Sequence, residues 1–174
     1  MTINRIIGLM ILLFIVEGTI MPWIIPEGYG ERIITHFTFV MVIYSAMYSG
    51  RHYALLFGIG FGMLQDIVYF GHLIGAHAFA MGLIGYFTGV LFERKRATIM
   101  MALSVIGIAC LLYDTMIFFI YKAFRITNET YAWAVLDHIL PSLFIQLAFA
   151  LAVYVPARRM FESQNKLKTE EEEQ

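Results

Sequence analysis

Six long apolar stretches alternate with five short hydrophilic breaks along the chain. The stretches cover residues 6–25, 33–49, 53–70, 73–92, 97–121 and about 131–155. A helix of about 20 residues crosses a hydrocarbon core of about 30 Å. We therefore expect an all-α, polytopic membrane protein with six transmembrane helices. The second and third stretches are shorter, so their helices would sit upright or thin the bilayer locally.

Lysine and arginine favour every second break, which predicts the orientation in the membrane. With the N-terminus in the cytoplasm, most of the basic residues lie on the cytoplasmic side: Arg5, Arg51, Arg94, Lys95, Arg96, Arg158, Arg159, Lys166 and Lys168. The outer side then holds Arg32, Lys122 and Arg125. Trp23 and Trp133 fall at the outer interface, where amphipathic rings favour the headgroup level. We expect a multi-pass protein with both termini in the cytoplasm.

Composition supports one membrane domain and little else. The 174 residues are 60% hydrophobic and 14% charged, whereas soluble domains average about a quarter charged residues. We expect a transmembrane domain over 1–160 and a short, disordered cytoplasmic tail over 161–174, which is polar and ends in glutamates. The first stretch lacks a small-x-small cleavage site, so we interpret it as an uncleaved span. The single cysteine, Cys110, excludes a disulfide framework.

Four carboxylates lie inside the apolar stretches, where a central charge costs roughly 2.5–3.5 kcal/mol. Counting along the helices places Glu17, Asp66, Asp114 and Asp137 all in the outer half of the membrane. Most histidines also lie near the outer ends: His36, His72, His77 and His138, with His52 alone on the inner side. This one-sided pattern indicates a polar cavity or a polar partner surface open to the outside. The alternative is that residues near helix ends merely reach headgroups and water.

The histidine spacing does not predict a metal site, because neither H-x3-H nor H-E-x-x-H occurs. We expect no metal and no cofactor. We expect the protein to contact the lipid bilayer and other membrane proteins, and we expect it not to bind nucleic acid.

The third stretch carries a predicted helix-packing seam. Gly58 and Gly62 form a GxxxG pair, Asp66 lies a further i+4 step along the same face, and Tyr69 follows at i+3. Further packing glycines follow in the fourth stretch at Gly82, Gly85 and Gly89. We expect Gly62→Leu to separate the helices and Gly62→Ala to be much milder, because one methyl group is often accommodated.

These residues resemble the rod shape-determining MreD family. The resemblance rests on the segment from Gly58 to Tyr69, the basic break at Arg51-His52 before it and the Leu-Ile-Gly-Ala-His-Ala-Phe exit at 73–79. The segment from Asp137 to Pro141 is similar to the family's Asp-Arg-x-x-Pro, with His138 where arginine is usual. Thr35-His36-Phe37 stands where the family usually has a proline.

The resemblance implies a non-enzymatic membrane scaffold of the bacterial elongation machinery, which controls rod shape and lateral peptidoglycan synthesis in the cell membrane. The implied partner is the bitopic protein MreC, whose single span would dock on these helices. MreB, RodA and an elongation transpeptidase would be indirect partners. The resemblance also implies a fold similar to the S components of energy-coupling-factor transporters.

Two other classes of function stay open. In the first, the chain is a small-molecule-binding, S-component-like subunit of an uptake transporter, with Glu17, Asp66 and Asp137 lining a pocket and a separate ATPase. In the second, it is an intramembrane aspartyl peptidase that uses two of Asp66, Asp114 and Asp137. The flanking motifs of such peptidases are not visible, so we expect no enzyme. The candidate partner or ligand residues are Glu17, Asp66, Tyr69, Asp137, His138 and Pro141.

Overall fold

The computed structural model is all-helical over the part of the chain that it describes, which confirms the all-α part of the expected fold. It describes residues 2–20, 23, 35–69, 73–92 and 98–172, and of 2–3 and 161–172 it describes the backbone alone. The elements run in the order α1 (Thr2–Ile15), the π-helical turn η1 (Val16–Ile20), α3 (Phe37–Ser49), α4 (Arg51–Val68), α5 (Ala76–Phe92), α6 (Ile99–Ala123), α7 (Tyr131–Ala134), the π-helical turn η2 (Val135–Ile139) and α8 (Leu140–Glu172).

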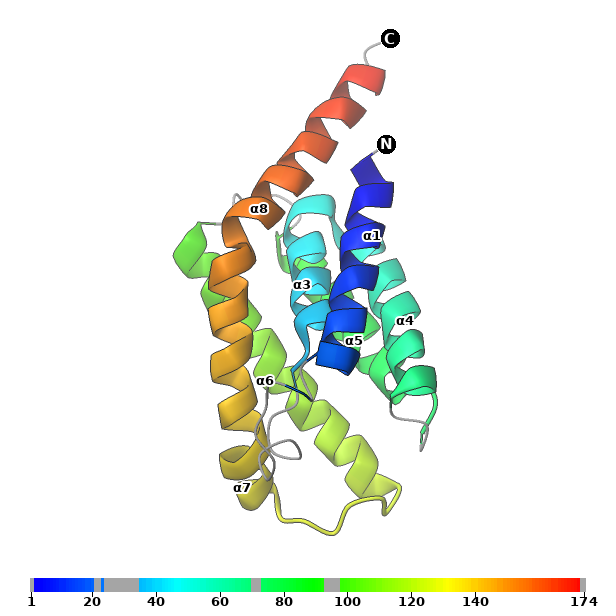
Figure 1. The fold of residues 1–174 in the computed structure, drawn as a ribbon, viewed down its shortest axis with the longest axis vertical. Coiled ribbons are helices and arrows are strands. Elements are labelled where there is room, and N and C mark those ends of the chain that lie inside the picture. The colour runs from blue at the N-terminus through cyan, green and yellow to red at the C-terminus, as the bar shows by residue number, and fades with distance from the viewer. Residues whose placement is uncertain (1, 21–22, 24–34, 70–72, 93–97, 173–174) are drawn as a thin grey trace.

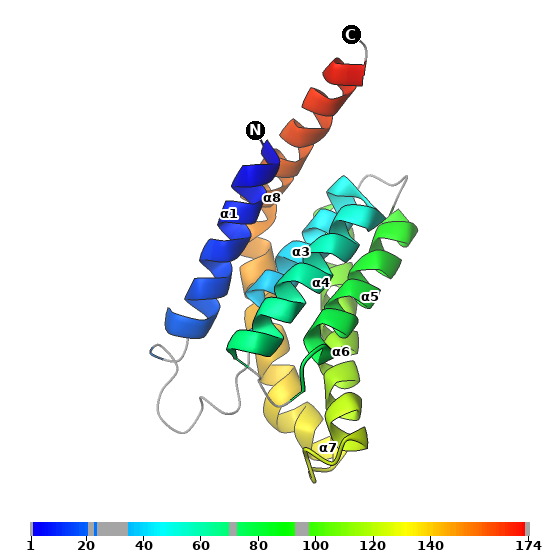
Figure 2. The same cartoon turned by 90° about the vertical axis from the view of Figure 1, so that its right-hand side faces the viewer.

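Helix α3 is the centre of the bundle. Every residue from Phe37 to Met47 is buried, and α3 packs against α1, α4, α5, α6 and α8. A helix that is apolar all round is typically buried, which accounts for a sequence without a polar face. Tyr44 ties α3 to α8 through a 2.7 Å hydrogen bond from its hydroxyl to the carbonyl of Ala150. The two ends of the chain lie at the same end of the bundle (Figures 1 and 2).

Helices α4 and α5 form the most extensively packed pair of the molecule. A Cβ atom built at Gly58 would lie 2.7 Å from the carbonyl oxygen of Met81, and one at Gly62 would lie 2.4 Å from the Cα of Ala78. From the other side, a Cβ at Gly89 would lie 2.4 Å from the Cα of Arg51. The glycines therefore let the two backbones approach more closely than any side chain permits.

Two further glycines of α5 line the same junction. A Cβ at Gly82 would lie 2.9 Å from Cγ1 of Ile59, and one at Gly85 would lie 3.0 Å from Cγ1 of Val42 in α3. The expectation that Gly62→Ala is mild does not fit this packing. The added methyl group at Gly62 would meet backbone atoms of α5, which cannot rotate away as a side chain can.

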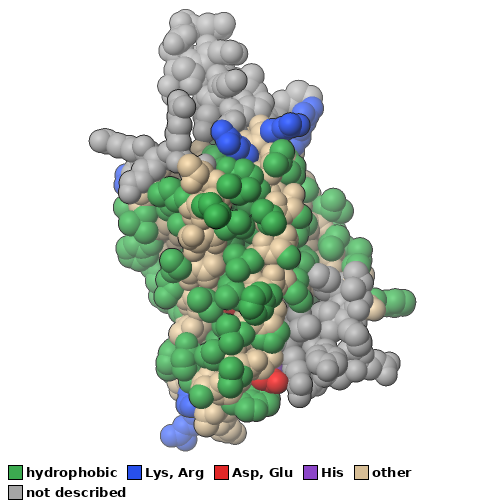
Figure 3. Space-filling view, turned by 90° about the vertical axis from the view of Figure 1, so that its left-hand side faces the viewer, with side chains coloured by type: hydrophobic (Ala, Val, Ile, Leu, Met, Phe, Trp, Pro, Cys, Tyr) green, Lys and Arg blue, Asp and Glu red, His purple; other side chains and the backbone are tan. Residues whose placement is uncertain are grey.

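Two helices are long and apolar enough to cross a membrane among the described residues. They are Ile99–Ala123, which is α6, and the continuous segment Tyr131–Met160 through α7, η2 and the first part of α8. Helices Phe37–Ser49 and Ala76–Phe92 are apolar but shorter. Hydrophobic side chains cover most of the face shown in Figure 3, with lysine and arginine mainly toward its two ends. Each expected stretch contains a helix, and a six-span arrangement stays a prediction.

Helix α8 continues to Glu172, through the segment 161–172 that we expected to be disordered. Its extension projects beyond the other helices at the end where both termini lie (Figures 1 and 2). The physical reason lies in composition, because glutamate, lysine and glutamine are good helix formers even without a packing partner.

Candidate functional site

A buried polar cluster lies at the end of the bundle opposite the two termini. Its members come from five segments of the chain and include three carboxylates and two histidines: Glu17, His36, Thr38, Gln65, Asp66, His77 and Asp114. Buried polar groups require partners, because an unsatisfied one costs about 1–3 kcal/mol. The hydrogen bonds within the cluster therefore show which side chains connect helices and which could still bind a ligand or a partner.

Glu17 is the junction of α1, α3 and α4. Its Oε2 accepts hydrogen bonds from the backbone N–H and the hydroxyl of Thr38, at 3.0 and 2.9 Å. Its Oε1 accepts a 2.8 Å hydrogen bond from Nε2 of Gln65. Glu17 lies in the π-helical turn η1, a deviation that is frequent at functional sites. Both oxygens are engaged, so Glu17 holds three helices together.

Asp66 caps the N-terminus of α5. Its Oδ2 accepts from the backbone N–H groups of Gly75 and Ala78 at 2.9 and 3.1 Å, and its Oδ1 accepts from the N–H of His77 at 3.1 Å. The ring Nδ1 of His77 lies 2.8 Å from the same Oδ1. Gly75 has a φ of 102°, which favours glycine. The N–H groups of a helix's first turn lack acceptors within that helix. The carboxylate of Asp66 in α4 provides acceptors for those of α5.

Tyr69 departs from the seam that the sequence predicted. It follows the last residue of α4 and turns to α1, where its hydroxyl donates a 2.8 Å hydrogen bond to the carbonyl of Phe14. The two rings stack with centroids 4.7 Å apart. Gly18 makes room for this ring, since a Cβ there would overlap the phenol. Tyr69 thus belongs to the α1–α4 contact, whereas Gly58, Gly62 and Asp66 face α5.

His36 joins the cluster to a second carboxylate. Its Nδ1 lies 3.7 Å from Oε1 of Glu17, and its Nε2 lies 3.6 Å from Oδ1 of Asp114 in α6. The ring packs edge-on against Tyr113 at a centroid distance of 4.8 Å and lies 6.4 Å from the ring of His77. A buried histidine thus lies between the two acids, one from η1 and one from α6.

Asp137, His138 and Pro141 lie outside the polar cluster, around η2. Nε2 of His138 is 3.7 Å from Oδ2 of Asp137 and 3.6 Å from Oε2 of Glu129, and its ring packs against Trp133. Pro141 has no N–H to donate to the carbonyl of Asp137 four residues earlier. The wide turn η2, which directly precedes α8, accommodates this missing bond.

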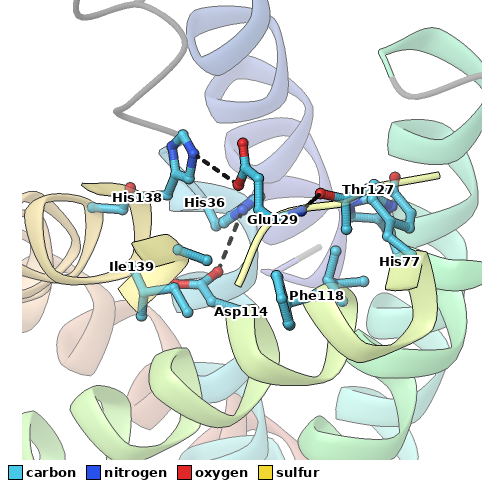
Figure 4. A pocket seen from close by; sticks show the side chains of 12 residues that line it. His36, His77, Asp114, Phe118, Thr127, Glu129, His138 and Ile139 are labelled. Atoms are coloured by element: carbon cyan, nitrogen blue, oxygen red, sulfur yellow. Dashed lines mark hydrogen bonds and ion pairs between the residues drawn. The ribbon is translucent and has the colours of Figure 1, made fainter. Parts of the chain in front are cut away.

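A cavity of about 360 Å³, which we call the outer pocket, opens between these two groups of residues (Figure 4). It is lined by His36, His77, Asp114, Ile117, Phe118, Tyr121, Thr127, Glu129, Ala134, His138, Ile139 and Ser142. Its carboxylates are Asp114 and Glu129. Glu17, Asp66 and Asp137, which we expected to line a ligand pocket, do not line this one, because the first two are consumed by helix contacts.

The geometry bears on the chemistry that the site can perform. The hydrogen bonds of Asp66 go to backbone amides and to His77, so this carboxylate does not share a proton with a second one, as a peptidase dyad would. Within the described ranges, no group of three or more His, Cys, Asp or Glu residues could hold a metal ion. The arrangement suits helix bracing and recognition of a polar group.

Sequence reasoning missed Thr38, Gln65, Tyr121 and Glu129 as members of these sites. Thr38 and Gln65 are short polar residues in apolar helices, and their complete burial is the signal that they need partners. Tyr121 lies near the end of its stretch and Glu129 in a loop, where polar residues are ordinary. Only the folded path of the loop brings Glu129 to the pocket, which Tyr121 reaches from α6.

Comparison with known proteins agrees with the resemblance seen in the motifs. The family model for rod shape-determining protein MreD matches residues 2–164, a range that includes the polar cluster and the outer pocket. The chain is similar to the rod shape-determining protein MreD of Bacillus subtilis (strain 168), with 24% identity over 130 residues, or 75% of each chain. No solved structure matches it. The chain therefore belongs to the MreD family of rod shape-determining proteins.

Proposed function

We propose that this protein is a non-enzymatic scaffold of the bacterial elongation complex, and that it sits in the cell membrane as six spans with both termini in the cytoplasm. The observation that carries the proposal is the family match over residues 2–164. An all-helical bundle with two membrane-length helices and both termini at one end (Figure 1) supports the topology, because an even number of spans returns the chain to the side where it began. The likeness to S components of energy-coupling-factor transporters stays a prediction.

The docking place that we propose for an MreC-type partner is a groove between α6 and α8. It has a volume of about 610 Å³ and is lined almost entirely by apolar side chains of the two helices: Leu103, Ser104, Gly107, Ile108, Leu111, Leu143, Leu147, Ala148 and Leu151. Gly107, Ser104 and Ala148 are small, and small residues let a membrane helix approach closely. The groove lies on the two described helices that are long enough to span, so a single transmembrane helix of a bitopic partner would match its apolar lining.

The test places a bulky side chain in the groove. Gly107→Leu would fill it, while Gly60→Leu makes the same change on an exposed face of α4, where a Cβ meets nothing within 4 Å. Each variant is expressed as the only copy, and both co-purification of the MreC-type partner and cell shape are recorded. We expect Gly107→Leu to lose the partner and give round cells, and Gly60→Leu to retain both.

Two results would count against this placement. If both variants retain the partner, the groove is not its docking site. If Gly107→Leu keeps the partner but abolishes self-association, the occupant is a second copy of this chain.

The outer pocket favours a second candidate, a small-molecule-binding subunit of an uptake transporter. This reading requires a separate ATPase, so purification from native membranes distinguishes it from the scaffold. A co-purifying transporter ATPase would support uptake, whereas an MreC-type protein would support the scaffold.

A further inference from the structure

The outer pocket has an unusual balance of charge for a cavity within an apolar bundle. Its polar lining consists of two carboxylates, three imidazoles and hydroxyl groups, and none of the described lining residues is a lysine or an arginine. Lys122 lies nearby, but its ammonium donates to the carbonyl of Glu129 and sits 5.4 Å from the centroid of the Phe118 ring. The pocket therefore presents more acceptors than fixed positive charge.

Four polar atoms of the lining residues are buried without a hydrogen-bond partner in the described part of the chain. They are Oδ2 of Asp114, the hydroxyl of Tyr121, and Nδ1 of His36 and of His138. The first two are oxygens, which can accept a hydrogen bond from a ligand. The other oxygen of Asp114 faces His36 at 3.6 Å, and only 11% of this side chain is exposed. An orphaned buried carboxylate oxygen costs more than an ordinary polar group. A ligand that donates a hydrogen bond at this point would remove that cost.

The remaining wall supplies apolar contact. Ile117, Phe118 and Ile139 line the pocket beside the carboxylates, and the volume of about 360 Å³ lies within the range of small-molecule sites. Phe118 already faces one ammonium group, that of Lys122, which shows that this wall accepts a cation. A matching ligand joins a positively charged donor to an apolar body.

We infer that the outer pocket binds a primary amine on an apolar body, with the ammonium group donating to Oδ2 of Asp114 and to the hydroxyl of Tyr121. Charge-assisted hydrogen bonds are roughly twice as strong as neutral ones. Two sources share this chemistry, a soluble organic amine and the ethanolamine headgroup of a lipid. The inference is independent of the α6–α8 groove, which shares no lining residue with the pocket.

The first experiment follows thermal unfolding of the purified full-length protein in detergent with three probes that share one aromatic body. Phenethylamine is the cation, 2-phenylethanol the neutral donor and 3-phenylpropionate the anion. We expect phenethylamine to raise the unfolding midpoint saturably, and the other two to act only at concentrations about tenfold higher or more. An equal effect of 3-phenylpropionate would overturn the inference, because the pocket would then not prefer a cation.

Matched variants locate the binding. Asp114→Asn keeps the shape but removes the charge, and the half-saturating phenethylamine concentration should rise about tenfold or more. Tyr86→Phe removes a hydroxyl from a side chain that does not line the pocket and should bind like the wild type. Tyr121→Phe removes only the hydroxyl and should weaken phenethylamine binding severalfold. If Asp114→Asn does not fold, Tyr121→Phe alone tests the proposed contacts. Unchanged binding in Asp114→Asn or in Tyr121→Phe would overturn the proposed contacts.

A second arm identifies the source of the amine. The protein is extracted from bilayers with equal phosphatidylethanolamine and phosphatidylglycerol, and the retained lipids are read by native mass spectrometry. Preferential retention of phosphatidylethanolamine that Asp114→Asn abolishes would assign the headgroup. Phenethylamine binding without that preference would assign a soluble amine. The inference would be overturned altogether if phenethylamine did not bind and phosphatidylethanolamine was not preferentially retained.

Discussion

Nδ1 of His77 in α5 lies 2.8 Å from Oδ1 of Asp66 in α4, and both side chains are almost fully buried. The same carboxylate receives the first backbone N–H groups of α5. One residue of α4 thus sets where α5 begins and how the hairpin closes. The sequence pattern made Asp66 a candidate partner or ligand residue. Its hydrogen bonds indicate instead that its main role is to stabilise the α4–α5 hairpin.

We predict that Asp66→Asn is destabilising by about 1.5–3 kcal/mol, the usual worth of hydrogen bonds to a charged group. An asparagine can accept with one side only, so its amide N–H₂ would face the N–H groups of Gly75 and Ala78 or those of His77. Thermal unfolding in detergent measures the change. His77→Ala, which removes one of four donors, should cost less. A stable Asp66→Asn that fails to support rod shape would instead show a direct need for the charge.

We predict that Gly62→Ala is destabilising by about 1–3 kcal/mol, as expected for an overpacked site. The new methyl group would lie 2.4 Å from the Cα of Ala78, so the α4–α5 backbones must separate. Gly60→Ala is the matched control, since nothing lies within 4 Å of its Cβ position, and it should stabilise slightly through helix propensity. Equal unfolding midpoints for the two variants would contradict the close packing of this hairpin.

Local features of the chain predicted a large part of the fold. Each apolar stretch contains a helix, and the glycine spacing in 58–62 and 82–89 predicted a close α4–α5 contact, because helical phase depends only on residues a few positions apart. Depth along each helix also follows from counting. The grouping of Glu17, Asp66 and Asp114 toward one end could therefore be expected before any helix was placed beside another.

The partners of those carboxylates could not be predicted, because they depend on the order of helices around the bundle. Glu17 meets Thr38 and Gln65 only because α3 lies at the centre, with α1 and α4 on its flank. The outer pocket depends further on the path of the loop after α6, where Arg125 has a φ of 57°. No periodic pattern encodes such a turn, so Glu129 could not be placed near Asp114.

We predict that the loop after α6 faces outward and that the C-terminal end of α8 faces the cytoplasm. Cysteine at 128 should react with an impermeant maleimide on intact cells, and cysteine at 168 should react only after permeabilisation. The native Cys110 is buried and provides the unlabelled background. Labelling at 168 on intact cells would reverse the orientation and place the outer pocket on the cytoplasmic side.

The last prediction concerns the pairing of Glu17 with Gln65. Glu17→Gln removes the charge that both Thr38 and Gln65 donate to, and the Gln65 amide must turn over so that its Oε1 accepts from the new N–H₂ group. Gln65→Glu sets two carboxylates at the 2.8 Å separation of the present hydrogen bond. Each single variant should lose about 1.5–3 kcal/mol of stability.

The double variant Glu17→Gln/Gln65→Glu should recover much of that loss, because the amide at 17 can again donate to residue 65 while its carbonyl oxygen accepts from Thr38. Thermal unfolding of the four proteins gives the interaction free energy directly. Losses that simply add would mean that Glu17 and Gln65 act separately, and that the junction of α1, α3 and α4 rests on Thr38 alone.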